Sequence, residues 1–385
     1  MFSRSNRIGV LITENEASKG YALEVLKGIR SALPDQHIYS STVQPSLTIQ
    51  TFLPGESIQA KVNQLVWQAN VSLIIGGITQ PEIEPLLQVS SGFELPVLLL
   101  NPEVPALRKY PHVFHVYPNT QELAKHLIRA AKEEKWETFT LLRGQGSEQE
   151  QFMKEIFVML HQEKKMRVVQ DLTFTPGNFA SMEAAALKIA NINPIYRKKE
   201  YANLVSQEQR RAQKEKRAFD PTKLVLPAKP LCDAVILPED FRTLHYFVKL
   251  LKFHGIRQLP FLGNQNWRNR ELIEPWDNFL QGSKFVDYVG LYSQLDRRIT
   301  SSTKLPDFFL PPQEAPKLDF KLIGLRAGTI AKEALNSPLR SVTPLSQLLQ
   351  RSLQPENGKP FFLQDHSSKW QTHVFTLNHG SLVHQ

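Results

Sequence analysis

Short apolar strands that alternate with helices constrain the fold of this chain more than any other feature of its sequence. Residues 7–12, 71–75 and 96–100 are rich in aliphatic and β-branched side chains on both faces. A helical spacing of apolar residues, as at 20–33, lies between such strands. Strands that are apolar on both faces are typical of a parallel sheet covered by helices. The sequence therefore predicts an α/β fold.

The same alternation begins again after residue 112, which indicates a second unit. The 385 residues exceed the roughly 250–300 at which one hydrophobic core stops growing. The second series of strands and helices is expected at 112–117, 121–134, 138–142, 148–162, 167–174, 180–192, 234–237, 241–254, 260–263 and 285–291. A Pro-rich loop at 293–318, helices at 325–335 and 343–353, and a β pair within 359–383 complete the chain.

The positive charge of the chain is concentrated in one segment. The formal net charge is +9, and residues 196–219 hold eight Lys or Arg against three Glu, which is +5. A charged helix is typical of a solvated surface, and no nucleic-acid-binding motif accompanies it. We expect a charged helical insertion and no nucleic-acid partner.

Cysteine content and hydropathy bound the compartment. Cys232 is the only cysteine, so the chain forms no intrachain disulfide and no Cys-based metal site. Apolar stretches such as 97–100 and 247–251 are far shorter than the roughly 20 residues of a membrane span. The first seven residues lead into an apolar strand without the core of a signal peptide. The chain is therefore expected to be either cytoplasmic or a mature domain cut from a longer precursor.

Three segments carry a resemblance to a known fold. An opening strand at 8–12 leads to a helix that contains Gly20 and Gly28. The run 73–79 is followed by a helix and by the strand 95–101, and the chain closes with 374–383. This order resembles the type I periplasmic-binding-protein fold, whose family includes the leucine/isoleucine/valine-binding proteins.

Two further segments resemble a subgroup of that superfamily. Residues 232–240 are similar to a "FDALFIPD" strand that follows a charged insertion, and 285–292 are similar to a "FVDGFF" element. Both are features of penicillin-binding-protein activator lipoproteins and related bacterial domains. The resemblance implies a module that regulates cell-wall synthesis through a protein partner.

The resemblance implies two doubly wound, Rossmann-like lobes joined by a three-strand hinge. Lobe one is expected at 1–117 plus 267–353, and lobe two at 118–266 plus 354–385, with the insertion 196–219 in lobe two. Ligand contacts made only in a closed arrangement of the lobes would shift an open–closed equilibrium.

The sequence departs from the amino-acid receptors of that family in two loops. Residues 143–148 lack the Asp and the Tyr-Gly pair that hold a ligand ammonium, and 13–19 have lost the usual Gly, Pro and Ser character. A modified cleft is therefore expected.

Candidate ligand contacts lie where strands end, because helix N-termini there offer free N–H groups. The candidates are Thr13, Ser18, Gly77, Thr79, Asn101, Arg143, Gln145, Glu239 and Gln265. Two alternatives stay open. Thr79, close to Pro81, also fits a helix cap, and Glu239 with Asp240 also fits the dipole of the helix that follows.

Other chemistries lack support in the sequence. The run 144–149 imitates a dinucleotide fingerprint but lacks its third Gly. His112 and His115 have no carboxylate or Cys at ligand spacing, and no nucleophile motif occurs. Trp267 and Trp276 fit packing better than sugar stacking. We expect no enzymatic activity, no cofactor and no metal.

Two functions remain open at this point. The expected function is a non-catalytic, bilobal interaction or regulatory module of the bacterial envelope, with an envelope protein as partner. The alternative is a periplasmic receptor for a small polar or amino-acid-like solute held in the interlobe cleft. Both imply a periplasmic or envelope-associated location, with a cytoplasmic one as the alternative.

Overall fold

The chain folds into two compact units, each built from separate segments. The computed structural model describes residues 5–13, 16–33, 45–53, 55–101, 109–146, 149–273, 277–288, 315–337, 343–350, 367–368, 370 and 372–384. The first unit comprises Met1–Asn119 with Leu291–Gln371, and the second comprises Thr120–Gly290 with Thr372–Gln385. The backbone therefore passes three times from one unit to the other.

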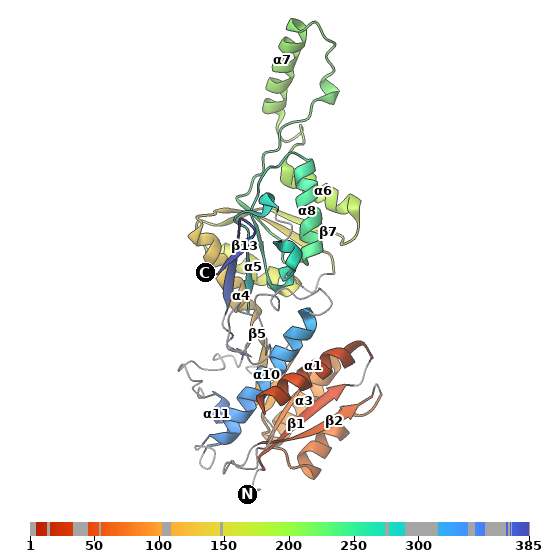
Figure 1. The fold of residues 1–385 in the computed structure, drawn as a ribbon, viewed down its shortest axis with the longest axis vertical. Coiled ribbons are helices and arrows are strands. Elements are labelled where there is room, and N and C mark those ends of the chain that lie inside the picture. Colours follow the sequence, from red (N-terminus) through yellow and green to blue (C-terminus); the bar gives the residue numbers. More distant parts are fainter. Residues whose placement is uncertain are drawn as a thin grey trace. The chain divides into compact units, whose positions relative to one another are not determined.

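The first unit is built on a parallel sheet of six strands in the order β11-β5-β4-β3-β1-β2 (Figure 1). The strands are β1 (Arg7–Thr13), β2 (Ser46–Phe52), β3 (Leu73–Gly76), β4 (Val97–Leu99), β5 (Val113–Pro118) and β11 (Ser367–Ser368). The inner strands β3 and β4 are completely buried, as their apolar sequences predict.

Helices cover both faces of this sheet, and neighbouring residues of β1 point to opposite cores. Val10 packs in one core with residues of α1 (Glu16–Ala32), α10 (Ala315–Asn336) and α11 (Leu345–Gln350). Leu11 packs in the other core, with residues of α2 (Ile58–Asn63), the π-helical turn Gln64–Gln68 and α3 (Gln80–Phe93). This alternation is the period of two of a strand that is buried on both sides.

Glycines allow α1 and α10 to pack with their backbones in contact. A Cβ atom on Gly28 would lie 2.0 Å from the carbonyl oxygen of Lys321, and one on Gly324 would lie 2.1 Å from that of Val25. Only residues without a side chain fit at these two positions. The two helices are therefore fixed to one another although almost 300 residues separate them in the sequence.

The second unit is built on a mixed sheet of seven strands in the order β13-β12-β10-β9-β8-β6-β7 (Figure 1). The strands are β6 (Thr138–Gly144), β7 (Arg167–Phe174), β8 (Ala234–Ile236), β9 (Phe261–Gly263), β10 (Lys284–Asp287), β12 (His373–Asn378) and β13 (Ser381–His384). β6 to β10 run parallel, and the terminal hairpin β12–β13 adds antiparallel to β10.

Two pairs of helices pack on this sheet. α4 (Thr120–Glu133) packs against α5 (Glu150–Gln162), and α6 (Phe179–Ala190) packs against α8 (Phe241–Phe253). The chain reverses direction across the sheet between β7 and β8, so right-handed connections place α5 and α6 on opposite faces. The expected α/β architecture with two Rossmann-like sheets is thereby confirmed.

The insertion contains one helix, α7 (Lys198–Lys214), and a return segment that folds back along it. The hydroxyl of Tyr201 donates to the carbonyl oxygen of Pro221 at 2.7 Å. Arg197 donates through Nη1 to the carbonyl oxygens of Pro227 and Asn191, at 2.6 and 2.9 Å. The Arg197 bonds hold the two ends of the insertion together beside the end of α6, and the Tyr201 bond holds the return segment to α7.

Some boundaries differ from those expected. The second change of unit falls after residue 290 rather than near 267, because β10 pairs with β9 and β12 of the second sheet. The third falls after 371 rather than near 353. The helix expected from 325 begins at Ala315, since Pro316 lies in its first turn, where the missing N–H costs no hydrogen bond. The rest of the expected loop 293–318 lies outside the described residues.

None of the helices in the described ranges has the length and apolar character of a membrane span.

Candidate functional site

Each sheet has a point where the order of its strands reverses. In the first unit β1 lies between β2 and β3, and in the second β6 lies between β7 and β8. The helices that follow two such neighbouring strands cover opposite faces, which opens a crevice at the carboxyl ends of the strands. The loops after β1, β3, β6 and β8 are therefore where ligand contacts are expected in each unit.

The loop after β3 is closed by a carboxylate of the chain itself. Glu82, in the first turn of α3, is fully buried. Its Oε2 accepts a hydrogen bond from the backbone N–H of Ile78 at 2.9 Å, and its Oε1 accepts one from the Thr79 hydroxyl at 2.7 Å. These donors lie at a helix N-terminus, where an external anion would otherwise bind. The anion position at the start of α3 is thus occupied.

Burial dominates the electrostatics of this carboxylate. Desolvation raises the pKa of Glu82 above its ordinary value, and the hydrogen bonds from Thr79, Ile78 and neighbouring backbone groups counteract only part of that rise. The charged form is therefore less favourable here than in water.

Thr79 and Glu82 have the spacing of a capping box, Thr-x-x-Glu. Sequence reasoning weighed Thr79 as a cap but missed Glu82, although this spacing is the signal that identifies it. The Thr79 hydroxyl donates to the Glu82 carboxylate within the first turn of the helix, so the choice between a helix cap and a ligand contact stays open.

Asn101 and Gly77 shape the same loop. The Nδ2 of Asn101 donates to the backbone carbonyl oxygen of Ile78 at 2.9 Å. The backbone carbonyl oxygen of Asn101 lies 2.6 Å from Nε2 of His115. Gly77 has a φ of 74°, and a Cβ there would lie 2.7 Å from the Leu99 side chain. Three of the first-unit candidates, Gly77, Thr79 and Asn101, therefore meet around Ile78.

The other two first-unit candidates lie at the end of β1 and at the start of α1. Thr13 is buried at the end of β1. Ser18 lies in the first turns of α1, and its side chain is outside the described residues.

The loop after β6 borders a pocket of about 200 Å³ in the second unit. Three of the expected residues, Arg143, Gln145 and Glu239, line it together. The remaining lining residues are Gly144, Gly146, Gln149, Glu150, Met153 and Thr173, of which sequence reasoning named none as a contact. Thr173 and Met153 carried no signal in the sequence. They lie in β7 and α5, and only the packing of these elements brings them to the pocket.

Arg143 and Gln145 are held from the side of β7. The Nη2 of Arg143 donates to Asp171 Oδ2 at 2.8 Å, and the guanidinium lies 5.7 Å from the centre of the Phe157 ring. The Oε1 of Gln145 accepts a hydrogen bond from the Thr175 hydroxyl at 2.9 Å. The positive charge at the pocket is therefore partly neutralised by Asp171.

Glu239 bridges the two loops of the second unit. Its Oε1 accepts a hydrogen bond from the backbone N–H of Gly144 at 3.2 Å. Asp240 is the N-cap of α8, since its Oδ1 accepts from the N–H of Thr243 at 2.8 Å. The helix-end explanation weighed for both residues thus applies to Asp240, whereas Glu239 reaches back to the loop after β6.

Gln265 and Trp267 belong to the second unit but not to the lining of this pocket. The Oε1 of Gln265 is buried and has no hydrogen-bond partner among the described residues. Trp267 is completely buried and donates through Nε1 to the carbonyl oxygen of Leu237 at 3.1 Å, so it packs rather than stacks on a ligand. Trp276 lies outside the described residues.

Within the described ranges, no group of three or more His, Cys, Asp or Glu side chains is arranged to hold a metal ion.

Residues 13–213, more than half of the chain, match the sequence profile of a family described as the receptor family ligand binding region. The matched range begins at Thr13 and contains the loops after β3 and β6. No curated protein sequence matches this chain significantly.

Three solved structures with the same fold are described as transporter or solute-binding proteins. A putative branched-chain amino acid ABC transporter from Rhodospirillum rubrum superposes with a TM-score of 0.64 at 12% identity, covering 98% of each chain. The branched-chain amino acid substrate-binding protein LivJ from Streptococcus pneumoniae, solved with isoleucine, gives 0.55 at 15% identity and also covers 98% of each chain. A solute-binding protein from R. palustris, solved with benzoate, gives 0.56 at 12% identity and covers 99% of this chain and 95% of its own.

Proposed function

The chain belongs to the family of receptor ligand-binding regions, and from this premise we propose that it is a non-catalytic receptor for a small polar solute. The observation that carries the proposal is the pocket at the reversal point of the second sheet, which Arg143, Gln145 and Glu239 line together. Both the family and the fold are those of binding proteins rather than enzymes.

The chemistry of the loops indicates which solutes fit. The N–H of Ile78 and the hydroxyl of Thr79 are bonded to Glu82, and the N–H of Gly144 is bonded to Glu239. A ligand carboxylate would have to displace one of these protein carboxylates or lie beside it, and like charges close together repel. We therefore propose a ligand that is neutral or cationic at these positions, such as a polyol, an amide or an amine.

The regulatory module expected from the sequence is the second candidate. The loops filled by Glu82 and Glu239 favour it, because they leave fewer free donors for a solute. The similarity of 232–240 to the penicillin-binding-protein activators also supports it. The family match and the structural relatives support the receptor more strongly, so the receptor is preferred.

A receptor of this kind acts outside the cytoplasm, and we propose a periplasmic or envelope-associated location. The similarity to the substrate-binding protein of an amino acid transporter supports this location.

A binding screen tests the proposal. Polyols, amides, amines and the twenty amino acids are added at millimolar concentration, and thermal unfolding is followed with calorimetry on every hit. A bound ligand stabilises the protein by about 2.7 kcal/mol at a hundredfold excess over its Kd. We expect a hit among the neutral or cationic compounds and none among the amino acids.

Matched variants locate the site. Arg143→Ala should weaken binding of a neutral ligand at least about tenfold, because it removes a hydrogen-bond donor, whereas a cationic ligand should bind no more weakly. Unfolding should be nearly unchanged, because the partly exposed pair with Asp171 contributes roughly 0–1 kcal/mol. Arg129→Ala, which removes another surface ion pair of the same unit, should change neither. Micromolar binding of an amino acid would overturn the neutral or cationic class and leave the receptor standing, whereas silence across the whole screen would favour the regulatory module.

A further inference from the structure

The insertion carries a set of cations that its own anions do not neutralise. All three glutamates of 196–219 are in ion pairs: Glu200 with Arg197 and Lys229, and Glu208 and Glu215 with Arg211 and Arg217. The remaining cations have no ion pair within the described part of the chain and are exposed; they are Lys198, Lys199, Arg210, Lys214 and Lys216.

Helical geometry gathers three of these cations on one side of α7. At 100° per residue, Lys199, Arg210 and Lys214 lie within about 60° of one another around the helix axis. Asn203 lies between them and Ser206 lies beside Lys199, so this side of the helix contains no acidic and no large apolar residue. The opposite side contains Tyr201, Leu204 and Ala212, and the return segment lies on that side. The hydrogen bonds of Tyr201 and Arg197 hold the helix in this orientation.

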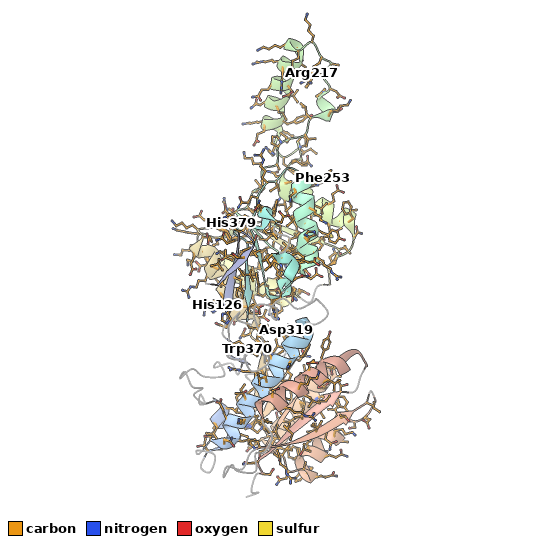
Figure 2. All side chains as sticks on the ribbon, in the orientation of Figure 1. His126, Arg217, Phe253, Asp319, Trp370 and His379 are labelled. Carbon is orange, nitrogen blue, oxygen red and sulfur yellow. The ribbon has the colours of Figure 1, made fainter. Side chains whose placement is uncertain are left out.

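Exposed apolar side chains lie just before α7, just after its return segment and at the end of α8. Ile195, Tyr196 and Phe253 are 67%, 79% and 79% exposed, and Leu231 is 51% exposed. Figure 2 shows Phe253 at the end of α8, on the side from which the insertion extends. Exposed apolar residues that gather in this way mark contact surfaces more often than scattered ones do.

Topology places these residues at the amino-terminal edge of the second sheet. α6 and α8 follow parallel strands and return to the edge where those strands begin, so Ile195, Tyr196 and Phe253 lie there. Leu231 lies three residues before β8 begins. The pocket residues Arg143 and Glu239 lie at the carboxyl ends of β6 and β8, which is the opposite edge.

We infer that the outer side of α7, together with Ile195, Tyr196 and Phe253, is a docking surface for an acidic protein partner. Aromatic side chains and arginine dominate the energetics of protein interfaces, and cations along one side of a helix steer a partner that presents carboxylates. A membrane fits less well, because the apolar side of α7 lies against its own return segment instead of facing outward. Single-stranded nucleic acid fits less well, because Tyr196 and Phe253 lie outside α7 and no aromatic residue alternates with its cations to stack successive bases.

Peptide binding tests this surface independently of the solute site. The probe is a labelled 20-residue peptide with two Phe residues flanked by Glu, and its reference has Gln in place of every Glu. Fluorescence anisotropy at low and at moderate salt measures both. The full chain should bind the acidic peptide at least about tenfold more tightly than the reference, and the affinity should fall as salt screens the charges.

Three variants separate this surface from a general effect of the +9 charge. The pair Lys199→Glu with Arg210→Glu, and separately Tyr196→Ala, should each weaken binding at least about tenfold. The pair Arg30→Glu with Lys109→Glu makes the same change in net charge on exposed residues of the first unit and should change affinity less than about twofold. Thermal unfolding is measured for every variant, and the two double variants should have similar melting temperatures.

Three results would overturn the inference. The first is no difference between the acidic peptide and its Gln reference. The second is an equal loss of affinity in both charge pairs. The third is binding of phosphatidylglycerol vesicles or a 20-nucleotide DNA at least as tightly as the peptide, with no effect of Tyr196→Ala, since that identifies a surface for any polyanion.

Discussion

The Oε1 atom of Glu239 lies 3.2 Å from the backbone nitrogen of Gly144, a residue 95 positions earlier in the chain. The bond joins the loop that follows β8 to the loop that follows β6, at the point where the order of the second sheet reverses. A Cβ on Gly144 would lie 2.8 Å from the same oxygen, so a side chain at that position would require the carboxylate to shift. In the first unit, Glu82 bonds to the loop after β3 in an equivalent way. Both units thus fill a ligand-type loop with a carboxylate of their own.

Removing the Glu82 carboxylate should destabilise the first unit. Glu82→Ala leaves the N–H of Ile78 and the hydroxyl of Thr79 without their acceptor. Loss of a buried acceptor costs about 1–3 kcal/mol. Glu84→Ala, two residues later on the exposed side of the same helix, should stay within about 0.5 kcal/mol. Urea unfolding of both variants measures the difference, and equal stabilities would contradict the bonding described for Glu82.

The same carboxylate should make stability depend on pH. Burial raises the pKa of Glu82 above that of the unfolded chain, so the folded state binds more protons between the two values. The free energy of unfolding should therefore decrease as pH rises from the ordinary Glu pKa through the raised one. The stability of the native protein minus that of Glu82→Gln, measured from pH 4 to 8, isolates this contribution. A difference that grows with pH would show that hydrogen bonding outweighs burial.

Two glycines of α1 should respond in opposite directions to alanine. Gly28→Ala forces α1 and α10 apart, since its Cβ meets backbone at 2.0 Å, and overpacking costs about 1–3 kcal/mol or more. Gly20→Ala meets nothing within 4 Å and should stabilise the helix by roughly 0.5–1 kcal/mol. Chemical unfolding of the two variants side by side is the measurement. A neutral Gly28→Ala would mean that the two helices do not touch.

A buried ion pair in the second unit should be sensitive to truncation. Nε of Arg268 lies 2.6 Å from Oδ2 of Asp287, and both side chains are almost completely buried. Asp287→Ala should cost about 3–5 kcal/mol, because it leaves a buried charge without this anion. Glu163→Ala breaks the exposed pair with Lys132 and should cost roughly 0–1 kcal/mol. Calorimetric unfolding measures the loss of stability in both variants. Similar losses would contradict the burial of the Arg268 charge.

Deleting the insertion should leave the second unit folded. Residues 198–226 are replaced by a short Gly-Ser linker, which removes α7 with most of its return segment and keeps Arg197. The helix contacts its own return segment, so we expect the melting temperature to change by no more than a few degrees. Thermal unfolding followed by circular dichroism tests this. Arg197→Ala in the full chain is the reference, because it removes the bonds to Asn191 and Pro227 without deleting α7. A loss of cooperative unfolding would mean that α7 is part of the core.

The sheets were predictable because burial on both faces leaves a mark in the sequence. β3 and β4 are short aliphatic runs, and both are completely buried. The closing hairpin β12–β13 was predicted from a different pattern within 359–383, since β12 alternates between buried and half-buried residues. The start of α10 was missed, because Pro316 was interpreted as a loop residue although proline is compatible with a first helical turn. The position of 267–288 depended on strand pairing across the sheet, which no local pattern contains.

The candidate residues were predictable only as loops. Gly77, Thr79 and Asn101 meet around Ile78, and Arg143, Gln145 and Glu239 meet at one pocket, because each follows a strand of a parallel sheet. What these residues bond to was not predictable. The contact between Glu239 and Gly144 spans 95 residues, and only the fold brings them together. Glu82 is the exception, since the Thr-x-x-Glu spacing was present in the sequence.

The glycine contact between α1 and α10 also determines when each unit can be completed during synthesis. A ribosome adds roughly 5–20 residues per second, and domains generally fold as units once their residues are available. α10 ends at Asn336, so one face of the first sheet is covered by α1 alone until long after β1 to β5 have been made. The second unit needs the last residues of the chain only for the hairpin β12–β13, which joins the edge of a sheet that already has five parallel strands. The part of the protein that is translated first is therefore the one that leaves apolar surface open to chaperones for longest.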